Sequence, residues 1–246
     1  MEKPRTVVWF SCGVASAVAG YLTLKDTPDA VLVYCDTGSE HMDSVRFRLD
    51  CEKWLDTPIL MIRSRRYRDT WQVFEERRYL SGPRGALCTT ELKKIPRREF
   101  QLPNDIQVFG YTFGEAARAT RFSEANPEVD LRTPLIEFGL TKADCHALIH
   151  EVGIGTPAMY GLGYKNNNCI GCVKGGAGYW NKIRRDFPEV FDRMAGIERV
   201  LGASIIRRNG QRVFLDELSP DMGRYESEPE ITCGLLCEAA LRGEEE

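Results

Sequence analysis

The sequence predicts an α/β fold: a doubly wound, mainly parallel five-stranded sheet with helices on both faces, followed by a Cys-containing C-terminal extension. Two observations predict the sheet. Short apolar runs alternate with segments of helical periodicity, and the first run passes through a Gly-containing turn straight into a helix of small residues. A third observation predicts the extension, because the chain changes character after Pro157, where a Gly- and Asn-rich loop begins. We therefore expect a core over 1–157 and, packed on it, an extension over 158–246.

Five apolar runs are the expected strands, and they span 6–10, 30–34, 58–62, 106–110 and 129–133. Helical periodicity between them predicts helices ending near residue 25 and covering 42–54, 89–100, 114–122 and 141–150. Pro96 should bend the helix that contains it, since proline has no N–H to donate. Ser11, Asp36 and Gly110 follow strands, so the topology brings them to one edge of the sheet, where ligands bind in such folds.

The extension is expected to hold a Cys-containing loop, helices over 178–185 and 188–201, a hairpin and an acidic tail. The hairpin strands, 205–208 and 212–215, flank Asn209-Gly210, a dipeptide that favours a tight two-residue turn.

Composition points to a globular protein of the cytoplasm. The 246 residues are 43% hydrophobic and 28% charged, with no apolar run of membrane-spanning length and no signal-peptide pattern. We therefore expect no membrane partner. The net charge is only −3, but a basic band runs from Arg63 to Arg98 and indicates contact with a polyanion, either a nucleotide or a nucleic acid. The alternative is a solvated helix face with local ion pairs.

The turn after the first strand is the clearest candidate binding site. Its backbone N–H groups, two serine hydroxyls and the positive end of a helix dipole converge on one point, which suits a phosphate. The alternative is a strand–helix turn that simply requires a glycine. The candidate phosphate-binding residues are Ser11, Cys12, Gly13, Val14, Ala15 and Ser16.

Nine cysteines are many for a cytoplasmic chain, where clustered cysteines more often indicate metal binding or redox chemistry than disulfides. Four lie in apolar or helical contexts and are expected to be buried: Cys12, Cys35, Cys51 and Cys145. Five lie in expected loops, where a thiolate can reach a metal or a substrate: Cys88, Cys169, Cys172, Cys233 and Cys237. The spacing Cys169-x-x-Cys172 lets two thiolates face one metal, with Cys88 and either C-terminal cysteine completing four ligands.

Taken in order, these motifs resemble the PAPS (phosphoadenosine-phosphosulfate) reductase-like branch of the adenine nucleotide α-hydrolases, in the ATP pyrophosphatase (PP-loop) superfamily. The resemblance runs over nearly the whole chain. It is carried by Ser11, Gly13 and Ser16 in the phosphate loop; Asp36, Thr37 and Gly38; Cys88 through Pro96; Gly110, Glu115 and Arg118; Pro134-Leu135; and Tyr160, Gly163 and Tyr164.

Two loop positions depart from the family pattern. Cys12 replaces a glycine, and Ala15 replaces an aspartate whose carboxylate would help to hold Mg²⁺. The metal would then be held by the nucleotide, by water or by another acid such as Asp36.

The resemblance implies a site for ATP or another adenine nucleotide with Mg²⁺, formed by the loop residues with Asp36, Thr37, Gly38, Gly110, Glu115 and Arg118. It implies catalytic roles for Cys233, Cys237, Lys93 and Asp36. It also implies a [4Fe–4S] cluster, with zinc as the alternative, on Cys88, Cys169, Cys172 and Cys233. The match is incomplete, because the cluster-binding members carry two adjacent cysteines where this chain has only Cys88.

Three functions follow as hypotheses. In the first, the protein adenylates a substrate oxygen that sulfur then displaces, as in DNA phosphorothioation or tRNA thiolation, with a sulfur donor such as a cysteine desulfurase and with nucleic acid on the basic band. In the second, Cys233 attacks the sulfur of phosphoadenosine or adenosine phosphosulfate, and thioredoxin restores it. In the third, the chain is a catalytically inactive nucleotide- or nucleic-acid-binding module with a structural metal. The oligomeric state is left open, and an oligomer is compatible with each hypothesis.

Overall fold

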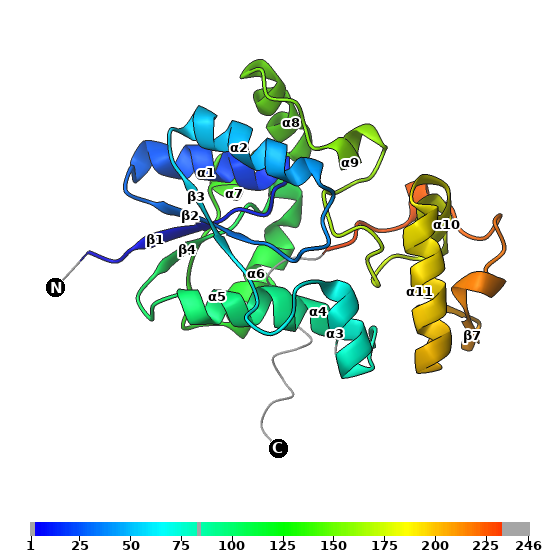
Figure 1. Cartoon of the computed structure of the whole chain (residues 1–246). Coiled ribbons are helices and arrows are strands. Elements are labelled where there is room, and N and C mark those ends of the chain that lie inside the picture. The colour runs from blue at the N-terminus through cyan, green and yellow to red at the C-terminus, as the bar shows by residue number, and fades with distance from the viewer. Residues whose placement is uncertain (1–2, 83–84, 233–246) are drawn as a thin grey trace. The chain divides into compact units, whose positions relative to one another are not determined.

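A computed structural model describes residues 3–82 and 85–232 of the chain (Figure 1). The described residues form two compact units that are not continuous in sequence. The first, here called the sheet unit, comprises 3–36, 41–63 and 96–167. The second, the helical unit, comprises 37–40, 64–82, 85–95 and 168–232.

The sheet unit contains a five-stranded sheet of order β3-β2-β1-β4-β5, in which every pairing is parallel. The strands are β1 (Thr6–Trp9), β2 (Val31–Cys35), β3 (Ile59–Ile62), β4 (Ile106–Val108) and β5 (Asp130–Arg132). Each lies within or next to a predicted strand, because buried parallel strands are nearly continuous apolar runs. The predicted fold class is confirmed.

Alternate side chains of β1 face opposite sides of the sheet, and each side carries helices. Val8 joins the core formed with α1 (Val14–Asp26), α2 (Asp43–Leu55) and α8 (Lys142–Glu151). On the other side Trp9 donates to Gln107 Oε1 over 2.9 Å and packs edge-to-face on Phe100 of α5 (Ile95–Phe100). Figure 1 shows α1, α2, α7 (Pro134–Glu137) and α8 on one side of the sheet and α5 and α6 (Ala116–Ala125) on the other.

The helix expected over 89–100 is present but irregular. It begins as a short turn, α4 (Leu87–Thr89), passes through a π-helical segment, η1 (Thr90–Lys94), and continues as α5. Pro96 lies just after the wide π-helical turns, which agrees with the expected disturbance because a proline nitrogen cannot close an α-helical hydrogen bond.

The helical unit is built around α3 (Thr70–Arg77), α10 (Ala177–Asp186) and α11 (Pro188–Leu201), with 3-10 turns η3 (Leu215–Glu217) and η4 (Tyr225–Ser227). The expected hairpin is present as β6 (Ile206–Arg208) and β7 (Gln211–Val213). Asn209 and Gly210 both have positive φ, as a two-residue hairpin turn requires. Buried Glu198 of α11 fixes the hairpin to the helix by accepting from the backbone N–H groups of Ile205 and Leu215, each over 2.6 Å.

These units differ from the single boundary that the sequence predicts after residue 157. The segment 64–95, inserted between β3 and β4, belongs with the C-terminal part of the chain, and the sheet unit extends to residue 167. Among the described residues, none of the helices has the length and apolar character needed to span a membrane.

Candidate functional site

The turn between β1 and α1 has the geometry of an anion-binding loop. Gly13 is the N-cap of α1 and has no side chain that could cap the helix, and the first turn carries no acidic residue. The first N–H groups of a helix need partners from outside it, and the helix dipole favours an anion there. Ser11 is exposed at the mouth of the loop, and Gly13 and Ala15 are half-buried. The loop can therefore receive a phosphoryl or sulfo group.

The two loop serines have different surroundings. Ser16 is 3% exposed, and its hydroxyl accepts from the Ser11 N–H over 3.0 Å and donates to the Gly13 carbonyl over 2.9 Å. It closes the loop from within, so of the two predicted hydroxyls only that of Ser11 is presented to a ligand. Cys12 adopts a left-handed φ of 56° and is fully buried, which turns its thiol away from the loop mouth.

The end of β4 lies against the start of α1. A Cβ atom at Gly110 would come within 2.9 Å of the backbone N and Cα of Ser16 and 3.0 Å of the Ala15 carbonyl carbon. Only glycine permits this approach, which explains why a glycine follows the fourth strand. Gly110 thus shapes the loop, and its predicted place at the site agrees with this geometry.

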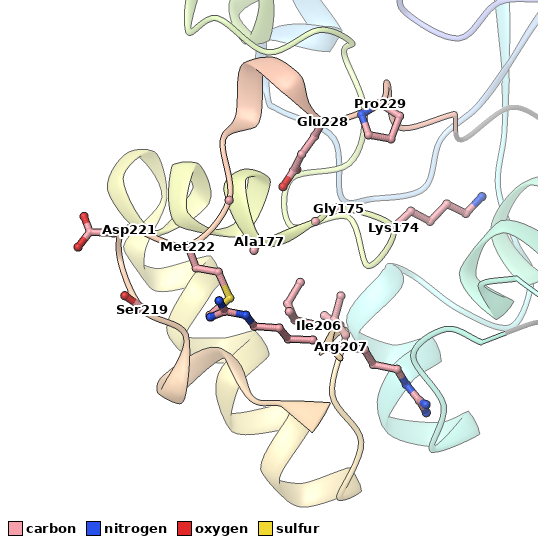
Figure 2. A pocket seen from close by; sticks show the side chains of 14 residues that line it. Lys174, Gly175, Ala177, Ile206, Arg207, Ser219, Asp221, Met222, Glu228 and Pro229 are labelled. Atoms are coloured by element: carbon pink, nitrogen blue, oxygen red, sulfur yellow. The ribbon is translucent and has the colours of Figure 1, made fainter. Parts of the chain in front are cut away.

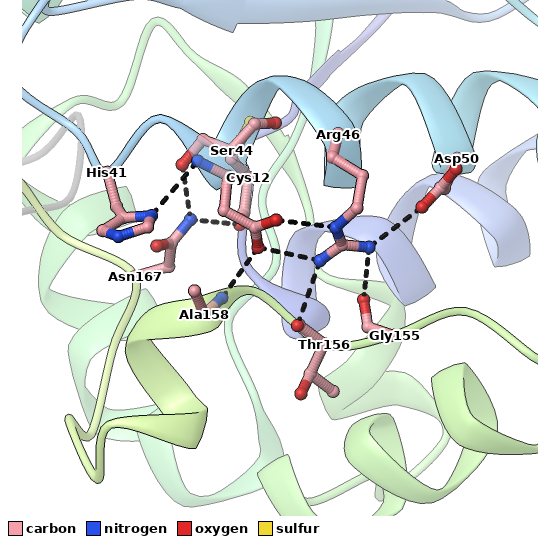
Figure 3. Close-up of polar contacts among 10 residues, drawn as sticks. Cys12, His41, Ser44, Arg46, Asp50, Gly155, Thr156, Ala158 and Asn167 are labelled. Atoms are coloured by element: carbon pink, nitrogen blue, oxygen red, sulfur yellow. Dashed lines mark hydrogen bonds and ion pairs between the residues drawn. The ribbon is translucent and has the colours of Figure 1, made fainter.

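Asn167 supports the loop from the other side (Figure 3). Its buried amide nitrogen donates to the Cys12 carbonyl over 2.8 Å and to Ser44 Oγ over 3.0 Å. The bond to Cys12 holds the one loop residue with a left-handed backbone, so Asn167 helps to maintain that conformation.

A second set of contacts in Figure 3 joins α2 to residues 155–158. Asp43 accepts from Arg46 Nε and Nη2 and from the Ala158 N–H, and Arg46 also donates to the carbonyls of Gly155 and Thr156. The hydrogen bonds from Arg46 hold the pKa of Asp43 below its ordinary value. The network anchors the start of α9 (Ala158–Gly161), which contains Tyr160, and the Tyr160 hydroxyl lies 3.2 Å from where a Cβ on Gly13 would be.

Asp36, at the end of β2, is ion-paired with Arg63, whose Nε donates to Asp36 Oδ2 over 2.8 Å. Position 15 carries no carboxylate. The loop and Asp36 therefore do not fit a Mg²⁺ site, because magnesium needs oxygen ligands, preferably carboxylates, and the one acid predicted for this role already neutralises a guanidinium.

Glu115 and Arg118 form a pair beyond β4. Arg118 Nη1 donates to Glu115 Oε1 over 2.7 Å, and its guanidinium lies 5.0 Å from the centre of the Tyr111 ring. Glu115 also accepts from the Thr112 N–H and hydroxyl in a capping box. These contacts hold Arg118 in place on the sheet unit.

Thr37 and Gly38 belong to the helical unit, where they lie beside the Cys-x-x-Cys loop. Thr37 Oγ1 is 3.1 Å from Cys169 Sγ, and the Ile170 N–H donates to the Ser39 carbonyl over 2.9 Å. Gly38 has a φ of 65°, in the left-handed region that favours glycine. Of these two predicted nucleotide-binding residues, Thr37 thus contacts the thiol loop, while Gly38 lies against the backbone of Arg68.

The Cys-x-x-Cys segment is an irregular loop, as expected, but its thiols are largely enclosed: Cys169 and Cys172 are each 7% exposed. The Cys172 N–H donates to the Tyr179 hydroxyl over 2.9 Å, which fixes the loop to α10. Gly171, between the cysteines, has a φ of 76°.

Cys88 is also buried, and it lies in the helical turn α4 rather than in the loop expected from the sequence. Within residues 3–82 and 85–232, no three His, Cys, Asp or Glu side chains come together as a metal site. Cys88, Cys169 and Cys172 therefore do not form a cluster site by themselves. Cys233 and Cys237 lie outside the described residues, so a ligand set that includes them stays a prediction.

The four cysteines expected to be core residues are all buried. Burial raises the pKa of the Cys51 thiol and of the Cys145 thiol to about 12. These two thiols are therefore protonated and unreactive at neutral pH.

The basic band is not uniformly accessible. Lys94 and Arg97 are buried, and Lys93, predicted to be catalytic, is half-buried in η1. Five arginines of the helical unit are exposed before α4 begins: Arg65, Arg66, Arg68, Arg77 and Arg78. Only part of the band can therefore meet a polyanion.

A cavity of about 690 Å³ lies in the helical unit between the start of α10 and the hairpin (Figure 2). Lys174, Arg207 and Glu228 are among its lining residues, and none of the predicted site residues lines it. Glu228 accepts from the N–H groups of Gly178 and Tyr179 over 2.6 and 3.0 Å, so it caps α10.

Sequence reasoning missed Asn167, the Asp43–Arg46 pair and Tyr179. Each contacts a residue distant in sequence or the backbone of a loop. The periodicity of apolar residues does not indicate such contacts. The run of three asparagines before Cys169 was the only local signal for Asn167.

No protein-family model matches the sequence, and no curated protein matches it. Solved structures do match, among them the crystal structure of phosphoadenylyl-sulfate (PAPS) reductase from Candida auris in a phosphate complex. The two chains superpose with a TM-score of 0.50 at 13% identity, over 68% of this chain and 82% of the reductase. This chain has a PAPS reductase-like fold. At this identity the likeness establishes the fold alone, and it agrees with the fold that the ordered motifs imply.

Proposed function

We propose that this protein is a sulfonucleotide reductase that binds phosphoadenosine or adenosine phosphosulfate at the carboxyl edge of its sheet. The observation that carries the proposal is the uncapped start of α1, with an exposed Ser11 at its mouth and with Gly110 and Asn167 bracing it. The PAPS reductase-like fold and the phosphate in the similar reductase structure support an anionic nucleotide as the ligand.

The reaction would use a thiolate of this chain and an external dithiol. Cys233, outside the described residues, would attack the sulfate sulfur, so that a sulfur–sulfur bond forms and the S–O bond to the nucleotide phosphate breaks. The nucleotide leaves with the bond electrons. A thioredoxin thiolate then attacks Cys233 Sγ, so that the bond from Sγ to the sulfo group breaks, sulfite leaves with the bond electrons and a mixed disulfide forms. The second thioredoxin thiol attacks this mixed disulfide, closes the thioredoxin disulfide and frees Cys233.

The groups around the loop favour this reductase reaction over ATP cleavage, because they include hydrogen-bond donors but few ligands for Mg²⁺. Adenylation with loss of pyrophosphate usually relies on Mg²⁺ to neutralise the phosphates, and Ala15 and the paired Asp36 do not supply the ligands it requires. Attack by a thiolate on sulfate sulfur needs hydrogen-bond donors and cations instead, which the loop N–H groups and Arg118 can supply.

The direct test supplies PAPS or adenosine phosphosulfate with reduced thioredoxin and measures sulfite. We expect sulfite from the wild-type protein and none from Cys233→Ser, with an S-sulfo adduct on Cys233 when thioredoxin is omitted. Cys145→Ser, at a core cysteine without a proposed role, is the control and should still form the adduct. Release of AMP or pyrophosphate from ATP, with no sulfite from either sulfonucleotide, would contradict the proposal.

Sulfur insertion into nucleic acid is the second candidate, and the exposed arginines of the helical unit favour it. Arg66 and Arg68 follow β3 closely and are exposed, with 77% of the Arg68 side chain accessible. Phosphate contacts by such residues give binding that weakens steeply with salt. Labelled ATP with DNA or tRNA would then yield AMP or pyrophosphate, and a protein that binds neither nucleic acid in low salt excludes this candidate.

A further inference from the structure

Arg97, in the first half of α5, is a buried arginine with two guanidinium nitrogens that have no hydrogen-bond partner in the described part of the chain. The residue is 5% exposed, and its Nε and Nη1 atoms find no hydrogen-bond acceptor among the residues that the structure describes. Arg5 is a useful contrast, because it pairs with Asp105 through Nε at 3.0 Å and Nη2 at 2.6 Å.

A guanidinium in this position needs an anion. Arginine does not lose its proton in proteins, and buried charges in native structures are normally paired. Burial removes water from the guanidinium and so lowers the pKa of Arg97. Glu128 attracts Arg97 electrostatically but is exposed and forms no ion pair with it in the described part of the chain.

The position of Arg97 points to the ligand edge of the sheet. Phe100, which ends α5, lies at the amino edge, where its carbonyl accepts from Arg5 Nη2 over 3.2 Å. Arg97 is three residues earlier in the helix and thus about 4.5 Å nearer to the carboxyl edge. Cys35, the last residue of β2, and Tyr111, which follows β4, lie within electrostatic range of its guanidinium.

Tyr111 lies near both Arg97 and Arg118, and Arg118 is the arginine that the sequence predicts to bind the ligand. The Tyr111 ring packs under the guanidinium of Arg118 at 5.0 Å, and the Tyr111 side chain also interacts with Arg97. Arg118 therefore contacts Tyr111 beyond β4, and Arg97 lies within electrostatic range of the same residue.

We propose that Arg97 binds a phosphate or sulfate ester group of the ligand, separate from the group that the loop binds. The planar guanidinium presents a fork of donors that matches two oxygens of such a group. The ligand is then a nucleotide with two anionic groups, such as a 3′-phosphorylated adenosine 5′-phosphosulfate, rather than one with a single group. This deepens the proposed function and rests on it only for the identity of the nucleotide.

The first test measures thermal unfolding of the wild type, Arg97→Met and Arg98→Met, in sodium chloride and in sodium sulfate of equal ionic strength. Arg98 is the matched control because it is the exposed neighbour on the same helix. In chloride, Arg97→Met should be at least as stable as the wild type, since it removes an uncompensated charge. In sulfate, the wild type and Arg98→Met should gain a larger rise in melting temperature than Arg97→Met.

The second test titrates adenosine 3′,5′-bisphosphate and AMP by calorimetry. Arg97→Met should weaken binding of the bisphosphate about 10- to 100-fold, and Arg97→Lys should retain part of the affinity, because it keeps the charge and loses the fork. AMP should bind the wild type and Arg97→Met with more nearly equal affinity.

The outcomes separate the two proposals. A sulfate effect that depends on Arg97 without any nucleotide binding supports the anion site and contradicts the proposed function. Equal bisphosphate affinity for wild type and Arg97→Met overturns the role of Arg97 and leaves the function standing. An Arg97→Met protein that is destabilised or unfolded in chloride also overturns it, because Arg97 is then a structural residue that needs no ligand.

Discussion

The contact between Gly110 and the start of α1 allows a sharp test of the loop. In Gly110→Ala the new Cβ would lie 2.9 Å from the backbone N and Cα of Ser16, about half an ångström inside ordinary van der Waals contact. The atoms it meets are backbone atoms of a helix start and cannot turn aside, so β4 or the loop must shift.

The magnitude follows from the kind of strain. Overpacking in a close-packed interior costs typically about 1–3 kcal/mol. For a chain of this size each kcal/mol corresponds to about 2–4 °C in melting temperature, so the expected loss is about 2–12 °C. The shift also displaces the N–H groups of α1 that are proposed to bind phosphate, so nucleotide affinity should fall more than the stability loss alone explains.

The assay combines thermal unfolding by circular dichroism with titration of adenosine 3′,5′-bisphosphate. Gly114→Ala is the matched control, because a Cβ there has nothing within 4 Å. If Gly110→Ala matches Gly114→Ala in both melting temperature and affinity, the argument that Gly110 shapes the loop is refuted.

The remaining predictions concern buried groups. Glu198→Gln should lower the free energy of unfolding by about 1–3 kcal/mol, measured by urea titration, because the amide can accept only one of the two N–H groups that Glu198 now accepts; an unchanged midpoint would show that the carboxylate does not hold the hairpin. Cys51 and Cys145, whose pKa burial raises to about 12, should resist iodoacetamide at pH 8 in the native protein and react once it is unfolded, as mass spectrometry of peptides can show; rapid native labelling would contradict the packing described. Asp43→Asn should cost about 1 kcal/mol at pH 7. Because Arg46 holds the pKa of Asp43 below 3.8, the stabilisation is present above that pH and is lost as the pH falls through the lowered value, so the variant's stability should fall less steeply in acid; parallel acid-unfolding curves for the two proteins would argue against the pair.

The strands could be predicted because each signal is local. A buried parallel strand such as β2 is an unbroken apolar run, and Asn209-Gly210 satisfies the backbone needs of a hairpin turn by itself. The turn after β1 could also be predicted, because a glycine and small residues between a strand and a helix are typical of a turn whose backbone N–H groups a ligand can approach.

The rest of the site depends on contacts between distant residues. Arg97 looks like any other member of the basic band until the packing of α5 shows that it is enclosed. Asp36 was expected to serve a ligand, and only the adjacency of β2 and β3 reveals that it pairs with Arg63. Thr37 was assigned to the nucleotide, but its contact with Cys169, over 132 positions of sequence, could not be inferred from either motif.

Because the two units are not continuous in sequence, they can complete their folding at different times during synthesis. The sheet unit uses no residue beyond 167, so a ribosome has delivered all of its pieces before the partners of 64–95 emerge. Contacts of that inserted segment with α11, such as those of Trp71 and Glu75 with Arg193, cannot form until α11 is synthesised. A nascent chain stalled near residue 167 is therefore the species in which chaperone binding or aggregation should be greatest.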